Sequence, residues 1–131
     1  MNAPSVDIKD ILVAESSLGL TFATDLFVGR EPAKPDNCVT VFDTPGFPPM
    51  LTLEGSAEFY YPSVQIRVRD NSYLNGWDLA QDIIEVLHGL NNETWNDTLY
   101  LLIQCSSGPA LLDWDDNNRA RFIINFNIQR R

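Results

Sequence analysis

Few side chains in this chain have a type and spacing suited to chemistry. The single histidine, His88, falls near the C-terminal end of a predicted helix, where the helix dipole favours a positive imidazole. The two cysteines, Cys38 and Cys105, are far apart and form no C-x-x-C pair, so we expect free thiols and no zinc framework. Phosphate-binding glycine loops and the G-x-S-x-G elbow are also missing from the sequence. These patterns predict a protein that is not an enzyme and needs no cofactor.

One segment, 113–118, has the alternating oxygen side chains of a calcium loop. Its sixth position is Asn118 where such loops have glycine, and its twelfth is Ile124 where they have glutamate. A polar hairpin turn explains the same residues. We therefore expect no metal site, although the sequence leaves open whether the turn from Asp113 to Asn118 binds a cation.

Three acidic residues, Asp78, Asp82 and Glu85, repeat at helical spacing on the polar side of a predicted helix. Paired carboxylates can act as acid and base if they are buried and opposed. On an exposed helix they are more often solvated charge. In a third interpretation they line an acidic surface that repels DNA passing nearby.

The clearest local pattern is a strand followed by a helix between residues 60 and 90. Val64, Ile66 and Val68 alternate with polar residues, as in a half-buried strand, and Arg67 and Arg69 are predicted to point outward. The spacing then becomes helical, with Ser72 as the predicted N-cap, Asp70 near the helix N-terminus and Gly89 just after the end. The predicted apolar stripe of this helix comprises Leu74, Trp77, Ile83, Ile84, Leu87 and Leu90.

The rest of the chain supplies more strands and one more helix. We predict a helix capped by Ser5 and ending before Gly19, and strands over 21–28, 37–44, 98–105, 110–114 and 119–130. The strand over 98–105 is apolar on both faces, which predicts a central position between helices, and 106–109 is expected to break it. The sum is an α+β domain: a mixed, mainly antiparallel sheet of about five or six strands with two helices packed on it.

The segment from Pro45 to Leu51 contains three prolines, so we predict a loop without regular structure. It nevertheless carries Phe47, Met50 and Leu51, and apolar side chains on a loop are usually covered. Either the edge of the domain's own core or a neighbouring subunit would cover them. Residues 53–59 are expected to extend the same loop.

Composition narrows the classes of partner. The chain has 131 residues, and we expect one domain spanning residues 1–131. Its 18 acidic and nine basic residues give a net charge of −9, which works against tight binding to nucleic acid. No apolar run approaches the ~18 residues of a membrane span, so we expect no membrane association. Four arginines close the chain and offer a basic end for head-to-tail contact: Arg119, Arg121, Arg130 and Arg131.

The segment Y-P-S-V-Q-I-R-V-R at 61–69, followed by the helix over 74–90, resembles the minor capsid or tail terminator proteins of long-tailed bacteriophages. The order of elements and the polar last strand are also similar. The resemblance implies a virion protein, made in the host cytoplasm, that forms a ring of usually six copies at the head-proximal end of the tail tube. The ring would stop tube elongation and provide the docking surface for the head connector. DNA would pass through it without specific binding.

Combined with the residues above, this resemblance gives two sets of expected surface residues. Phe47, Met50, Leu51, Arg130 and Arg131 are predicted at the subunit interface. Asp78, Asp82 and Glu85 are predicted to face the DNA channel. Two alternatives remain: a head-closure or tail-completion adaptor, and a monomeric acidic binding or inhibitor module.

Overall fold

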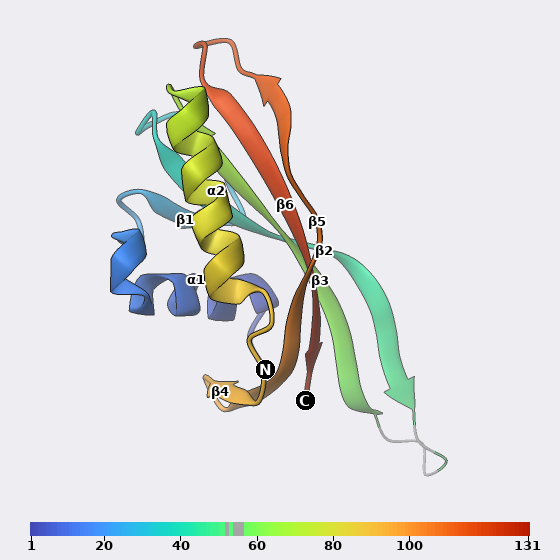
Figure 1. Ribbon diagram of the computed structural model, residues 1–131. Helices are drawn as coiled ribbons and strands as arrows, with labels where there is room; N and C mark the ends of the chain where they lie inside the picture. The colour runs from blue at the N-terminus through green and yellow to red at the C-terminus, as the bar shows by residue number, and fades with distance from the viewer. Residues whose placement is uncertain (52, 54–56) are drawn as a thin grey trace.

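The computed structural model describes residues 1–51, 53 and 57–131. Within them, two α-helices and a short 3-10 helix accompany one mixed six-stranded sheet with the strand order β1-β2-β3-β6-β5-β4 (Figure 1). The predicted α+β class is confirmed. The elements, in chain order, are α1 (Pro4–Ala14), η1 (Ser16–Leu18), β1 (Leu26–Val28), β2 (Cys38–Leu51), β3 (Ala57–Asp70), α2 (Tyr73–Leu87), β4 (Glu93–Trp95), β5 (Thr98–Trp114) and β6 (Ala120–Arg130).

Every strand pair is antiparallel except β1 with β2, and β3 and β6 form the middle of the sheet. Both helices cover the same face of the curled sheet, α1 across β1 and β2 and α2 across β3, β6 and β5 (Figure 1). Their apolar stripes and the inward residues of the strands bury one another in a single cluster. The last strand, β6, alternates between buried and less buried residues, and Phe122, Ile124, Phe126 and Ile128 are all buried.

Helix α2 begins and ends where its capping residues predict. The Ser72 hydroxyl accepts a hydrogen bond from the Asn75 backbone N–H, and Asp70 accepts one from Ser72. Gly89, just beyond the helix, has the left-handed φ of 86° that suits a glycine. The predicted stripe is wrong at one position: Leu74 is 71% exposed, because the buried side of α2 follows Gly76, Ala80, Ile83 and Leu87, and Leu74 lies outside that row.

The first helix differs from its prediction at both ends. Ala3 is the N-cap residue, and Ser5 lies inside the first turn, where its hydroxyl donates to Asp43 on β2. The helix ends at Ala14, and the residues up to Leu18 form η1 before Gly19 adopts a left-handed φ of 66°. The predicted strand over 21–28 shortens to Leu26–Val28, because only those residues find a partner strand in β2.

Two predicted breaks in the sheet are wrong for the same reason. The Gly108-Pro109 segment does not interrupt β5, and the proline-rich segment 45–51 is the outer half of β2. Both strands absorb these residues as irregularities in register, between Cys105 and Ala110 and between Thr44 and Leu51. Prolines are tolerated there because these parts of β2 and β5 have a partner strand on one side only. Strand β5 is not sandwiched between helices, because both helices cover the same face of the sheet, and Leu102 is 37% exposed.

Candidate assembly surfaces

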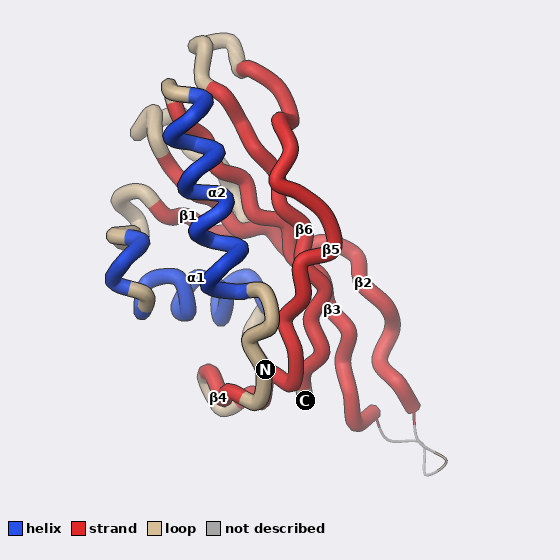
Figure 2. The backbone as a smooth tube through the Cα atoms, in the orientation of Figure 1, coloured by secondary structure: helices blue, strands red, loops and turns tan. Residues whose placement is uncertain are grey.

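The outer halves of β2 and β3, residues 44–51 and 57–63, project past the helices as a tongue (Figure 2), and the end of β6 still pairs with β3 at Ser63 and Tyr60. Phe47 pairs with Tyr61, and Met50 pairs with Phe59, so the two strands stay joined along the tongue. Gly46 lets them approach closely, since a Cβ atom at this position would lie 2.1 Å from the Tyr61 carbonyl oxygen. The segment 53–59 was expected to extend the loop, but strand β3 begins within it, at Ala57. Residues 52 and 54–56 lie outside the described residues.

The tongue carries the apolar residues that the sequence singled out. Phe47 is 76% exposed, Met50 53% and Leu51 69%, so the domain's own core does not cover them. An open hollow on the tongue is lined by Phe47, Pro48, Met50 and Tyr61. Exposed apolar groups of this size gathered on one projection are typical of a surface that meets another protein.

A second exposed apolar surface lies at the opposite end of the sheet, where β5 ends and α2 begins (Figure 1). Trp114 stacks on Tyr73 with 6.4 Å between ring centroids, and Tyr73 meets the buried Phe122 edge-on at 5.0 Å. Trp114 is 50% exposed, and Leu74 beside Tyr73 is more exposed still. We call this group the Trp114 patch; it comprises Tyr73, Leu74, Leu111 and Trp114.

The two C-terminal arginines lie in different surroundings. Arg130 is 7% exposed, and its Nη1 donates to the Asn2 carbonyl at 2.9 Å and to the Tyr100 hydroxyl at 3.2 Å. Arg131 is exposed and lies over the ring of Phe59, the residue of the tongue that pairs with Met50. Only Arg131 of the two is therefore placed to contact another molecule.

Asp7 is the buried acid opposite Arg130. Its carboxylate is completely buried and accepts hydrogen bonds from the Tyr100 hydroxyl, Asn96 and Asn2. Burial raises the pKa of Tyr100, and the hydrogen bond to Asp7 raises it further. The cluster ties the first turn of α1 to β5 and β6, a structural connection that sequence spacing does not reveal.

The acidic residues of α2 are on its solvent side, as predicted. Asp78, Asp82 and Glu85 are all exposed. A shallow hollow between α2 and η1 brings Glu15 beside Asp82 and Glu85. Glu15 was not identified from the sequence, because it comes from a distant element that only the fold places there.

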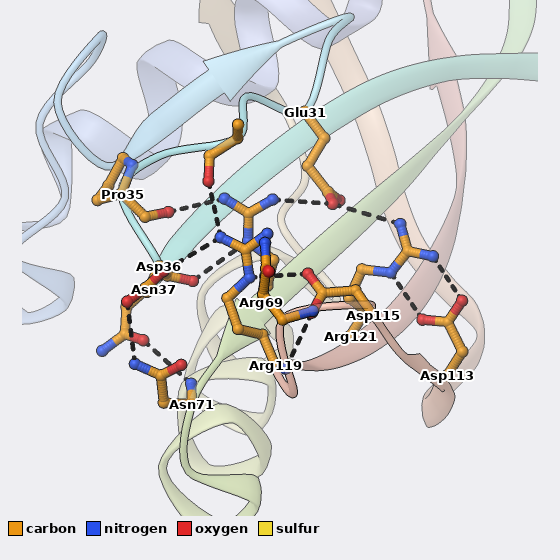
Figure 3. A network of polar contacts seen from close by, with 12 residues as sticks. Glu31, Pro35, Asp36, Asn37, Arg69, Asn71, Asp113, Asp115, Arg119 and Arg121 are labelled. Atoms are coloured by element: carbon orange, nitrogen blue, oxygen red, sulfur yellow. Dashed lines mark hydrogen bonds and ion pairs between the residues drawn. The ribbon is translucent and has the colours of Figure 1, made fainter.

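Three arginines form a network of ion pairs and hydrogen bonds at the end of the sheet, and Arg69, expected to point into solvent, is buried within it (Figure 3). Arg69 is 3% exposed; it pairs with Glu31 at 3.1 Å and donates to the carbonyl oxygen of Pro35. Arg121 contacts the same Glu31 and also pairs with Asp113. The outward prediction for Arg69 is wrong, because the loop between β1 and β2 folds over it.

The turn between β5 and β6 uses its acidic residues within this network. Asp115 accepts hydrogen bonds from the backbone N–H of Asn117 and of Arg119, and from Arg119 Nε at 2.7 Å. Burial raises the pKa of Asp115, but the bonds from Arg119 and Asn117 outweigh this and lower it. Arg121 holds the pKa of Asp113 below its usual range through its hydrogen bond. Arginines thus satisfy Asp113 and Asp115, two of the carboxylates in the segment considered as a cation loop, and no cluster suited to a metal occurs in the described part of the chain.

The remaining reactive side chains are engaged structurally. His88 Nδ1 accepts a hydrogen bond from the Cys105 backbone N–H at 2.9 Å. Both cysteines are free thiols, as predicted, and burial raises the pKa of each, which makes them poor nucleophiles. Among the described helices, none is long and apolar enough to cross a membrane.

Comparisons with known proteins agree with this geometry. The model of a family described as bacteriophage tail terminator protein matches residues 13–131. A chain from a structure titled "Virion of native gene transfer agent (GTA) particle" has a similar fold, with a TM-score of 0.69 and 13% sequence identity. The similarity covers 98% of this chain and 94% of that one. No curated protein matches the sequence.

Proposed function

The chain belongs to the bacteriophage tail terminator proteins, and we propose that it forms a ring that caps the head-proximal end of the tail tube. Membership makes it a structural protein of the phage tail. The ring would stop the tube from growing and provide the surface on which the head connector docks. The observation that carries the proposal is the family match over 13–131, on a chain with an exposed apolar tongue at one end.

The tongue is the proposed subunit contact within the ring. A ring is built from heterologous contacts, in which one surface of each subunit meets a different surface of the next. Phe47, Met50 and Leu51 supply apolar area for such a contact, and Arg131, over the Phe59 ring of the tongue, supplies a cation. Arg130 contributes indirectly, because its side chain is used inside the subunit to hold α1 in place.

The exposed acidic side of α2 is the proposed lining of the DNA channel. Asp78, Asp82 and Glu85 form a row along the helix, and Glu15 lies beside its second half. Proteins bind DNA mainly through lysine and arginine side chains, which neutralise the phosphates and release their counterions. A surface of carboxylates therefore offers the phosphates no binding partner. A genome could then pass the ring without being retained.

Electron microscopy of the purified protein with tails that lack a terminator tests the capping role. We expect a ring of six copies at one end of each tail, and tails of uniform length. Mixing at high protein concentration favours ring assembly even where the contacts between subunits are weak. Decoration of heads or portals instead of tail ends would assign the protein to head closure. Binding to neither would contradict the proposal and favour a monomeric acidic binding module.

A further inference from the structure

We propose that the tongue of one copy docks on the Trp114 patch of the next copy in the ring. This inference rests on the proposed ring and identifies the surface that receives the tongue. It brings together Phe47, Met50 and Leu51 of one subunit and Tyr73, Leu74, Leu111 and Trp114 of its neighbour.

The two surfaces lie at opposite ends of one sheet (Figure 1). The tongue extends from one end of β2 and β3, whereas the Trp114 patch lies where β5 ends and α2 begins. Each is apolar and exposed, with Phe47 at 76% and Leu74 at 71%. Two different surfaces at opposite ends are what a head-to-tail contact requires, since a self-complementary surface would stop at a dimer.

The flanking charges are complementary. Arg131 lies over the Phe59 ring of the tongue and has no ion pair in the described part of the chain. Asp116, two residues after Trp114, is exposed and likewise unpaired among described residues, whereas Arg121 and Arg119 occupy its neighbours Asp113 and Asp115. A tongue seated on the Trp114 patch would bring this free cation to this free anion, which fixes the direction of docking.

Backbone pairing between sheets is a poor alternative for this contact. The outer edge of the tongue carries Pro45, Pro48 and Pro49, and the free part of β5 carries Pro109. None of these residues has an N–H to donate to an added strand. Contact between side-chain surfaces is the route that remains open to the two ends.

Disulfide cross-linking of mixed variants tests the docking. One protein carries Met50→Cys and a second, of different mass, carries Leu74→Cys; both also carry Cys105→Ser, and Cys38 is buried. We expect a disulfide heterodimer on oxidation of the mixture and little homodimer from either protein alone. One chain carrying both cysteines should give a ladder ending at the ring size. An Asp97→Cys protein replaces Leu74→Cys as the control and should not cross-link.

Two further changes make the test specific. Phe47→Asp in the tongue protein should lower the heterodimer yield roughly tenfold, the effect of about 1.4 kcal/mol. Arg131→Glu in the tongue protein or Asp116→Lys in the patch protein should each lower the yield, and the two together should restore it. All these positions are exposed, so we expect the substitutions to leave the fold intact, and thermal melting of each variant checks this.

The outcomes separate this inference from the proposed function. Efficient cross-linking of the Met50→Cys protein with itself, or no heterodimer although wild-type rings cap tails, would overturn the docking and leave the capping role standing. A heterodimer that the charge exchange fails to restore would also contradict the arrangement. Rings that close through this contact but do not bind tails would instead overturn the capping role alone.

Discussion

Arg130 Nη1 lies 3.7 Å from Asp7 Oδ2, and this buried pair joins the first helix to the last strand of the sheet. The two residues are separated by most of the sequence. Tyr100 completes the cluster by donating to Asp7 and accepting from Arg130. Helix α1, most of which lies outside the matched span 13–131, is therefore an integral part of this domain.

Asp7→Asn should destabilise the fold by about 3 kcal/mol, because removing one partner leaves a buried charge on Arg130 without compensation. Urea unfolding followed by circular dichroism measures the change. Asp82→Asn, on an exposed site of α2, is the matched control and should change the free energy of unfolding by less than about 0.5 kcal/mol. Equal stability of the two variants would show that the buried pair is not important.

Asp115→Asn should cost about 1–2 kcal/mol at neutral pH, because the carboxylate loses its ion pair with Arg119 while the amide oxygen still caps the turn. The pKa of Asp115 is lowered in the folded protein, so its contribution is present above the unfolded pKa of about 3.9. It is lost as the pH falls through the folded pKa. Unfolding curves of the two proteins should therefore converge in acid. A difference that stays constant down to the acid limit would contradict this origin.

Much of the fold could be predicted because local signals and packing agree. The alternation of β6 and the capping of α2 by Ser72 both follow from residues that the structure uses as expected. The prolines predicted breaks in the strands, because the neighbouring sequence does not reveal whether a strand lies at the edge or in the middle of the sheet. Pro48 and Pro109 lie on stretches with one free side, and whether a strand has a free side depends on the order of strands rather than on local sequence.

The candidate surfaces were predictable only in part. Phe47 and Met50 stood out because apolar residues among prolines need a cover. Leu74 was missed as a member of the Trp114 patch, because it matched the period of a buried stripe although its side chain is exposed in the structure. Arg69 matched an outward pattern and Arg130 was expected at the subunit interface, yet distant carboxylates pair with them, Glu31 with Arg69 and Asp7 with Arg130.

Pro48→Thr with Pro49→Thr should increase aggregation, because it restores backbone donors on the free edge of the tongue and adds a residue with high strand propensity. Light scattering over time at constant protein concentration measures it. Pro32→Thr, in the loop between β1 and β2, changes a proline away from any strand and should leave scattering unchanged. Identical behaviour of the two variants would mean that the prolines do not protect this edge.

Replacing Asp78, Asp82 and Glu85 with lysine should make DNA passage slow, because the proposed channel wall would then hold phosphates that it now repels. Rings should still form on tails, since these side chains are exposed and lie outside the tongue. Infectivity and the rate of DNA release from particles are the measurements. Higher salt should relieve the delay in release, because the screening length falls from about 10 Å at 0.1 M to about 3 Å at 1 M.

A control with the same number of added lysines separates channel position from net charge. Glu93, Thr94 and Asp97 are exposed on and beside β4, away from α2, and their replacement by lysine should leave DNA release close to that of the wild type. If both triple variants slow release equally, the effect comes from overall charge, and α2 does not line the channel. If neither does, phosphates do not approach these surfaces, and the lining belongs to another face of the subunit. If the acidic side of α2 lines the channel, only the α2 variant should release DNA slowly and in a salt-sensitive way. Only in that variant would the added lysines contact the phosphates of the passing DNA.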